Sequence, residues 1–457
     1  MAPKLPDDLK SSIVVSLVAL PLCLGIALAS GAPLSSGILA GIIGGIITGL
    51  VSNSHISVSG PAAGLTVIVL AQIERFGLTQ FYNIVLMAGL LQIFFSLIKG
   101  GRIGDLFPNA VIHGMLAAIG ITLIIKQIPL ALGSNLSEFS LSPQHLLISL
   151  ITLVTIITWD KFNFRFNYLS FIPSALLAVG ISIILNISFD LFAAKDLVSI
   201  PDQLLSTIHM NLPSSFSLEL FMGAVTIAVV ASLETLLCID AADKIDHEKR
   251  VTNKNRELLA QGLGNTLCGI IGALPVTAVI VRTTTNIGAG AKTKWSAIFH
   301  GLWLLLFISL GSSLLNKVPL ATLAVILLIV GYRLSRPALF KMMYKKGIDQ
   351  FFIFCATIIA ILMTDLLKGI IIGLVICLIM EAKFFKNKVT IKEVSKNKLI
   401  SFNARTTYFT RLTIQQVFSK LREDEILEIQ KSQEMNPDVQ DLIDDLKKRY
   451  PEKIVIS

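Results

Sequence analysis

The stretch of residues 11–73, SSIVVSLVALPLCLGIALASGAPLSSGILAGIIGGIITGLVSNSHISVSGPAAGLTVIVLAQI, contains no Asp, Glu, Lys or Arg in 63 consecutive residues. In the whole chain of 457 residues, 53% of the residues are hydrophobic and 15% are charged. A soluble globular protein carries about 25% charged residues, so this chain has too few polar side chains to cover its surface in water. The composition excludes a water-soluble enzyme and predicts an all-α polytopic membrane protein.

Outward from this stretch, prolines, glycines and charge clusters divide the chain into fourteen apolar segments. Most of them approach the length of about 20 residues that a helix needs to cross a bilayer. The third and the tenth are shorter, and each follows an extended stretch that contains proline. The segments lie near residues 11–30, 34–51, 61–73, 79–98, 108–127, 145–159, 171–189, 218–239, 256–273, 277–288, 295–315, 318–333, 350–364 and 366–384.

The charges of the loops predict how the chain is oriented. If the N-terminus is cytoplasmic, the cytoplasmic loops hold sixteen Lys and Arg residues and the opposite loops hold five. Cytoplasmic loops of membrane proteins carry such an excess, so we expect a multi-pass protein of the inner (plasma) membrane with both termini in the cytoplasm. The net charge of +9 lies in these short clusters and does not indicate a nucleic-acid-binding face.

The chain also contains signs of an internal repeat. Segments one to seven (about 11–190) and eight to fourteen (about 218–385) each have their short segment in third place. Because each half holds an odd number of segments, the two halves are inverted relative to each other, and matched interruptions of this kind are typical of transporter binding sites. We therefore expect a transmembrane transport domain at 1–387. A small α+β cytoplasmic tail is expected at 388–457, with strands at 399–402 and 453–456 and helices at 413–421 and 439–450.

The two interruptions are the first candidate site. A helix that begins after such a break offers unpaired N–H groups and a partial positive charge, which attract anions. Two helix starts that face each other near the middle of the membrane would hold one small oxyanion without a cationic side chain. The alternative is a pair of ordinary proline kinks, which membrane helices tolerate. The predicted substrate-binding residues are Ser59, Gly60, Pro61, Ala62, Val276, Thr277 and Ala278.

Two charged residues inside apolar segments form the second candidate. Glu234 lies in the eighth segment, where a carboxylate must face the protein interior, and it is a candidate for proton coupling or for a structural acid. Cys238, one turn later, belongs to the same coupling position and has no hydroxyl oxygen for sodium. Arg282 lies in the tenth segment. It could pair with Glu234, add positive potential at the anion site, or extend toward the cytoplasm.

Metal ions and organic cofactors are not expected. His55, His113 and His300 do not have the spacing of metal ligands. The five cysteines are odd in number and lie in apolar stretches, which argues against a disulfide framework. The expected partners are an inorganic anion, the lipid bilayer and a coupling ion, either H⁺ or Na⁺.

Several motifs resemble one family of membrane proteins. The first segment, LPLCLGIALASG at 20–31, resembles the opening of the sulfate permease (SulP) family of inorganic anion transporters. The resemblance extends over about residues 8–385 and includes Ser59-Gly60-Pro61, Pro275-Val276-Thr277 with Arg282, Thr283 and Asn286, and Asp365 with Gly369.

This resemblance implies fourteen segments in two inverted sevens. A core domain (segments 1–4 and 8–11) would move against a gate domain (5–7 and 12–14) in an elevator-like exchange, and a homodimer is expected. It further implies an anion between the ends of the third and tenth helices and a functional carboxylate at Glu234. The sequence departs from the family's pattern at two places. The first span has no Gln near Cys23, and the tail resembles a shortened version of the family's STAS domain.

Sulfate with proton symport and bicarbonate with sodium symport are the leading interpretations. Sodium-coupled bicarbonate members of the family carry Asp at the position of Glu234, so the glutamate favours proton coupling. An uncoupled anion exchanger or channel-like conductor, a nucleobase-type permease on the same fold, and a membrane receptor whose tail is the output remain as alternatives.

Overall fold

The structure is a computed structural model that describes residues 5–101, 104, 107–133, 142–162, 172–201, 217–382, 389–394, 397–402, 406–407, 410–419, 421, 425–430 and 435–456. Within these residues, eight helices are long and apolar enough to cross a bilayer. Two further apolar helices, Ser174–Phe189 and Ile348–Met363, are shorter. The chain is therefore a mostly helical, multi-pass membrane protein, as its composition predicts.

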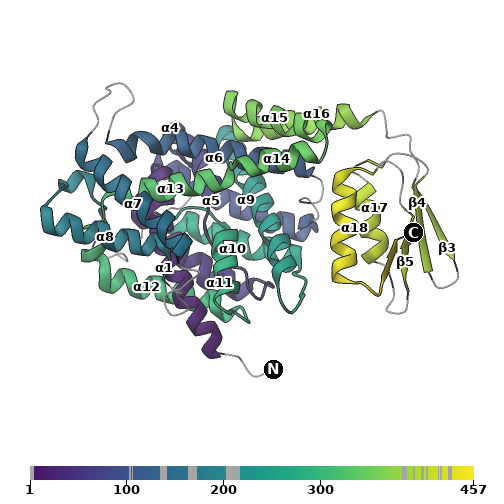
Figure 1. Cartoon of the computed structure of the whole chain (residues 1–457), viewed down its shortest axis with the longest axis horizontal. Helices are drawn as coiled ribbons and strands as arrows, with labels where there is room; N and C mark the ends of the chain where they lie inside the picture. Colours follow the sequence, from purple (N-terminus) through teal and green to yellow (C-terminus); the bar gives the residue numbers. More distant parts are fainter. Residues whose placement is uncertain are drawn as a thin grey trace. The chain divides into compact units, whose positions relative to one another are not determined.

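The N-terminal half contains one short helix in the predicted place. The 11-residue helix α4 follows the first interruption, after the short strand β1. The elements of this half are α1 Leu5–Ala29, α2 Leu34–Ile43 with a π-helical turn Gly44–Thr48 and α3 Gly49–Val51, β1 Ser59–Pro61, α4 Thr66–Phe76, α5 Leu78–Leu97, α6 Asn109–Leu132, α7 Pro143–Phe162 and α8 Ser174–Phe189. Figure 1 labels α1 and α4 to α8.

The second half repeats this pattern with a 9-residue helix, α11, after the second interruption. The stretch between the twelfth and thirteenth predicted segments was expected to be a loop, but it forms the helix α14, which begins with a proline at its first position. The elements are α9 Leu218–Ile245, α10 Lys254–Ile271, β2 Val276–Ala278, α11 Ile280–Gly288, α12 Trp295–Leu315, α13 Leu320–Leu334, α14 Pro337–Lys345, α15 Ile348–Met363 and α16 Leu366–Ala382.

Glycines bring some of these helices into backbone contact. A Cβ atom added at Gly45 of the π-helical turn would lie 2.7 Å from the Cα of Gly301 on α12. A Cβ added at Gly89 of α5 would lie 2.2 Å from the backbone nitrogen of Thr266 on α10. Small residues allow this close approach in membrane proteins, where helix packing replaces the hydrophobic effect. The close contact with α5 fixes α10, which supports the candidate site.

The residue contacts divide the chain into two compact units. One comprises Met1–Gly104 and Ile119–Ser335, and the other comprises Asp105–Ala118 and Arg336–Ser457. Both short strands and both short helices belong to the first unit. In the second unit the start of the C-terminal helix α18 (Pro437–Arg449) is bonded to the membrane helices: the Asn109 N–H donates to Asp438 Oδ2 at 3.1 Å, and the Asn436 amide donates to Glu381.

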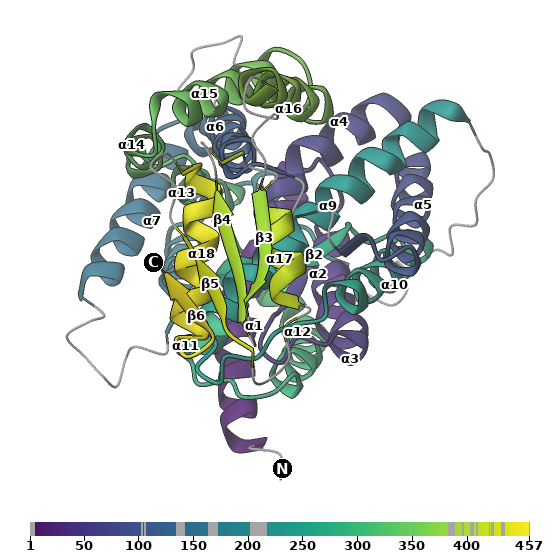
Figure 2. The same ribbon diagram turned by 90° about the vertical axis from the view of Figure 1, so that its right-hand side faces the viewer.

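The C-terminal residues form a small α/β layer. Strands β3 Val389–Val394, β4 Asn397–Phe402, β5 Leu427–Ile429 and β6 Ile454–Ile456 make one sheet in that order, antiparallel between β3 and β4 and parallel elsewhere. Helices α17 (Thr410–Ser419) and α18 cover one face of the sheet (Figure 1), whose other face is turned to the viewer in Figure 2. The sequence predicted the other strands and helices but missed β3 and β5.

Candidate functional site

The two interruptions meet in the structure as a pair of short strands. β1 and β2 pair in antiparallel register, with Ser59 opposite Ala278, Gly60 opposite Thr277 and Pro61 opposite Val276. All six residues are buried, and Ala62 directly after β1 is buried as well. The structure therefore brings together all seven residues predicted to bind substrate, although they come from opposite halves of the chain.

Each strand leads into a helix that the side chain of its own N-cap residue does not cap, although the Gly64 N–H before α4 is hydrogen-bonded to the Glu234 carboxylate. Ala62 is extended and precedes a 3₁₀ turn and α4, while Val279 is extended and precedes α11. Neither residue caps its helix with a side chain. Free N–H groups and the helix dipole make such a start attractive to an anion. Two of these starts leave the same strand pair.

Arg282 lies on the side of β1 toward which a side chain at position 60 would point. Its side chain is fully buried, and a Cβ added at Gly60 would lie only 1.9 Å from Arg282 Nη1. Nη2 donates to Cys23 Sγ at 3.3 Å and to the Pro61 carbonyl at 3.5 Å. The snorkelling position expected as one alternative is therefore wrong, because the guanidinium remains in the interior.

The buried charge of Arg282 has no carboxylate partner among the described residues, so the predicted alternative of a pair with Glu234 is not formed. Its Nε and Nη1 atoms lack hydrogen-bond partners. Both ring nitrogens of the fully buried His300 are unpartnered too. An isolated buried charge is strongly unfavourable, and a bound anion would relieve it.

Glu234 lies next to the start of α4, the short helix of the first half. A Cβ added at Gly64, in the turn before α4, would stand 2.6 Å from Glu234 Oε2, so this backbone lies directly against the carboxylate. Glu234 Oε2 has no hydrogen-bond partner. On the same face of α9, Cys238 Sγ contacts Thr283 Oγ1 at 3.7 Å. The two residues predicted for coupling thus face α4 and α11 respectively.

A polar face of α10 was missed by the sequence analysis. Glu257, Gln261 and Asn265 are spaced by four residues and are fully buried. Asn265 holds β2, because its Oδ1 accepts the Val276 N–H at 2.6 Å and its Nδ2 donates to the Val276 carbonyl at 3.0 Å. Three strongly polar residues at this spacing within an apolar segment are the signal that could have identified this face.

The same face holds β1 and the preceding loop. Gln261 Nε2 donates to Ser59 Oγ at 2.7 Å and to Glu257 Oε1 at 3.1 Å. Ser52 donates its hydroxyl to Glu257 Oε2, and Ser52 Oγ accepts the Ser54 N–H at 3.0 Å. A continuous hydrogen-bond chain therefore runs from the loop before β1 to β1 itself.

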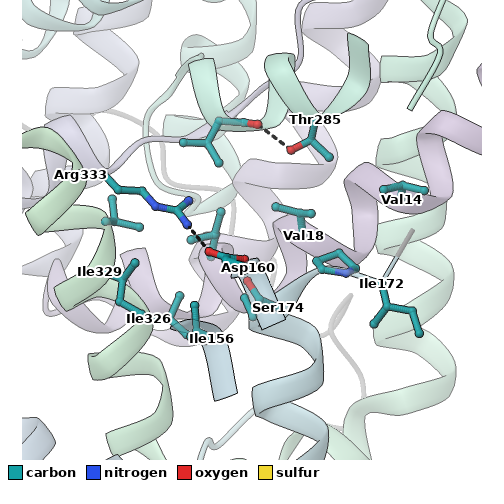
Figure 3. Close-up of a pocket in the computed structure, with 15 residues that line it drawn as sticks. Val14, Val18, Ile156, Asp160, Ile172, Ser174, Thr285, Ile326, Ile329 and Arg333 are labelled. Carbon is teal, nitrogen blue, oxygen red and sulfur yellow. Dashed lines mark hydrogen bonds and ion pairs between the residues drawn. The ribbon is translucent and has the colours of Figure 1, made fainter. Parts of the chain in front are cut away.

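A cavity of about 220 Å³ lies in the same unit, between α1, α7, α8, α11 and α13 (Figure 3). The seven predicted binding residues do not line it. Its wall includes Leu22 and Val281, the sequence neighbours of Cys23 and Arg282, so the cavity borders the helices that carry these two residues. The lining residues are Val14, Val18, Leu22, Ile156, Asp160, Ile172, Pro173, Ser174, Ala175, Val281, Thr285, Ile326, Ile329, Val330 and Arg333.

The residues considered for a metal site are those that the structure describes. Among them, no group of three or more His, Cys, Asp or Glu side chains is placed to hold a metal ion. All five cysteines are free thiols. The features that the site does contain are helix starts, a guanidinium and carboxylates, which suit an anion and a small coupling ion.

Known proteins resemble the chain over most of its length. A putative sulfate transporter of Bacillus subtilis, YvdB, is 30% identical over 397 residues, which cover 82% of this chain and 73% of the relative. The bicarbonate transporter BicA of Synechocystis is 28% identical over 431 residues, covering 88% and 75%. The solved transmembrane domain of a cyanobacterial BicA superimposes with a TM-score of 0.70 at 26% identity, covering 82% of this chain and 98% of that domain.

These relatives are transporters and not enzymes. The family model described as the sulfate permease family matches residues 5–357, which is well over half of the chain. The resemblance noted in the sequence is confirmed: this chain belongs to the sulfate permease family.

Proposed function

We propose that this chain is a secondary active transporter that carries a small inorganic oxyanion, sulfate or bicarbonate, across the inner membrane. The observation that carries the proposal is the fully buried Arg282, which has no carboxylate partner among the described residues, beside two helix starts that their own N-cap residues leave uncapped. N–H groups from both starts would donate to the anion, and the guanidinium would balance its charge. The relatives named as sulfate and bicarbonate transporters support the substrate class.

The cavity beside α1 and α11 suits a small ion. Its volume of about 220 Å³ is below the roughly 300–1,000 Å³ of pockets that bind drug-sized ligands. Most of its described lining side chains are apolar, and among them are few of the convergent polar groups that a nucleobase would need for its edges. This favours an inorganic anion over the nucleobase-type permease on the same fold.

Coupling is assigned to Glu234. The carboxylate lies against the backbone before α4 and has an unpartnered oxygen, so it can take up a proton or ligate a sodium ion next to the anion. Cys238 contributes a thiol that already contacts Thr283 and is a poor sodium ligand. We therefore favour proton symport with sulfate, with sodium symport of bicarbonate as the second candidate.

The transport cycle that we propose is an elevator-type movement. The helices would form fourteen segments in two inverted repeats, at about 11–190 and 218–385, within a transport domain at 1–387. The core segments that carry both strands would move past the gate segments, with both termini in the cytoplasm and the chain in a homodimer. The tail at 388–457 would be a reduced STAS-like domain.

The decisive experiment is uptake of labelled sulfate and of labelled bicarbonate into proteoliposomes that contain the full chain. We expect saturable uptake that an inward proton gradient accelerates. Acceleration by sodium instead would select the bicarbonate interpretation. Transport that saturates but ignores both gradients would indicate an uncoupled exchanger, and non-saturable conductance would indicate a channel. Absence of transport of both anions would reject the proposal.

A further inference from the structure

The cavity wall contains one ion pair. Of the fifteen described residues that line it, Asp160 on α7 and Arg333 on α13 are charged, and Ser174 and Thr285 carry hydroxyl groups. Arg333 Nη2 lies 2.9 Å from Asp160 Oδ2, as the dashed line in Figure 3 shows. The other side chains of the described lining residues are apolar, so Arg333 is the one cationic side chain that an anion would meet among them.

The pair is weak enough to open. The Arg333 side chain is 53% exposed and that of Asp160 is 44% exposed, and exposed ion pairs contribute about 0–1 kcal/mol. A guanidinium has five N–H donors, and Arg333 uses one of them in the hydrogen bonds found among the described residues. The remaining donors form the planar fork that matches a carboxylate or another oxyanion.

From this geometry we propose that Arg333 is a docking point for the transported oxyanion inside the cavity, and that Asp160 occupies it when the anion is absent. The inference rests on the proposed function, because it takes the cavity as part of the anion's path. An oxyanion has the same oxygen acceptors as the Asp160 carboxylate, so it can replace that carboxylate on the guanidinium. Asp160 thereby neutralises the cavity when it is empty and competes with the anion when one enters.

The start of α8 adds to the positive potential at this point. Ser174 and Ala175, the first two residues of α8, line the same cavity, and the N-cap residue Pro173 provides no side-chain cap. The Thr285 hydroxyl donates its hydrogen to the Val281 carbonyl at 2.8 Å, so it does not donate a hydrogen bond to an anion in the cavity. Among the described lining residues, Arg333 is thus the side chain that can bind an anion by charge and by hydrogen bonds together.

The competing explanation is that the pair merely ties α7 to α13, and the two explanations predict different signs. If the pair is a tie, Asp160→Asn and Arg333→Gln remove the same interaction and shift anion affinity in the same direction. If Asp160 competes with the anion, Asp160→Asn strengthens binding and Arg333→Gln weakens it. Arg333→Lys keeps the charge but loses the fork, so it should weaken sulfate binding more than chloride binding.

The test is equilibrium binding of sulfate, bicarbonate and chloride to the purified full chain and its variants. We expect the sulfate Kd to fall about fivefold in Asp160→Asn and to rise about tenfold in Arg333→Gln, the size of one lost charge-assisted hydrogen bond. The matched controls are Arg75→Gln and Glu219→Gln, which break another exposed ion pair of the same unit, at 3.1 Å and away from the cavity lining. Both should leave the Kd unchanged.

The outcomes separate this inference from the proposed function. If the wild-type chain binds sulfate or bicarbonate but the two cavity variants shift the Kd in the same direction, or not at all, the docking role is wrong and the proposed function stands. If the wild-type chain binds neither oxyanion, both are wrong. Melting temperatures of all variants close to that of the wild type would show that the chain remains folded in each comparison.

Discussion

The guanidinium of Arg282 lies so close to Gly60 that a side chain at position 60 would collide with it: an added Cβ stands 1.9 Å from Nη1. The arginine comes from the second half of the chain and the glycine from the first. Their contact places the buried guanidinium directly against β1.

Gly60→Ala should therefore disrupt the site. The new methyl group must displace either the buried guanidinium or β1, so we expect sulfate uptake to fall at least tenfold and the melting temperature to drop. Gly288→Ala is the matched control, because a Cβ there has no heavy atom within 4 Å. Wild-type uptake by the Gly60 variant, measured in proteoliposomes, would show that transport does not depend on the close contact between Arg282 and Gly60.

Glu234→Gln should separate binding from coupling. The amide has nearly the volume of the carboxyl group and imitates its permanently protonated state. We expect the variant to bind anion and to keep exchange, while a pH gradient no longer accelerates net uptake. Glu219→Gln, on the exposed start of the same helix, is the control and should respond to pH like the wild type. Acid-stimulated net uptake by the Glu234 variant would assign coupling elsewhere.

Asn265→Ala should loosen β2. It removes both hydrogen bonds to Val276 and the 2.7 Å bond to Gln92 Oε1, and leaves these buried groups unpaired. With about 1–3 kcal/mol for each buried unpaired group, we expect a clearly lower melting temperature and weaker sulfate binding. Thr226→Ala removes only an exposed bond to its own helix and should change neither quantity. Equal melting curves for the two variants would contradict the supporting role of α10.

The stability of the C-terminal helix α18 should depend on pH through Asp438. Burial raises the pKa of Asp438 above its ordinary value, although the Asn109 N–H and the nearby Arg411 oppose this shift. In acid both the folded and the unfolded carboxyl groups are protonated. As the pH rises through the ordinary pKa of an aspartate, the carboxyl group of the unfolded chain ionises first. This ionisation favours the unfolded chain, so the free energy of unfolding falls. Asp438→Asn has no proton to lose, so its melting temperature relative to the wild type should rise from pH 4 to pH 8. A constant difference would show that Asp438 does not titrate in this way.

Cysteine labelling tests the predicted orientation. In a Cys355→Ser background, which removes the most exposed native thiol, His247→Cys and Lys345→Cys should react with an impermeant maleimide from the cytoplasmic side only. Lys195→Cys should react from the opposite side. All three positions are exposed on the protein. Labelling of all three from one side would reject the fourteen-segment arrangement.

The two interruptions were predictable because proline leaves a local signature. Pro61 and Pro275 prevent each short helix from extending further toward the N-terminus, because the residue before a proline is disfavoured in a helix. The residue types around them already indicated helix starts. Their pairing as antiparallel strands was not predictable. Pairing depends on contacts between residues more than two hundred positions apart, and three-residue strands have no alternating pattern of their own.

The polar face of α10 shows another limit. Glu257 lies at the start of the segment next to a basic loop, where a charged residue is normally exposed, so nothing in the sequence marked it as buried. Only the packed helices show that it is fully buried and accepts hydrogen bonds on both oxygens. Likewise, Arg282 could be located in the tenth segment from sequence, but the direction of its side chain depends on the space that Gly60 leaves.

The attachment of both strands to one helix affects how anion preference could be altered. Ser59 of β1 and Val276 of β2 are bonded to the same face of α10, at Gln261 and Asn265. A substitution in either strand is therefore transmitted to the other, and engineering there would disturb the shared frame before it changed selectivity. Leu22 and Val281 line the cavity from the helices that carry Cys23 and Arg282, and they make none of these hydrogen bonds to α10, so we expect substitutions there to alter anion preference with less disturbance of the two strands.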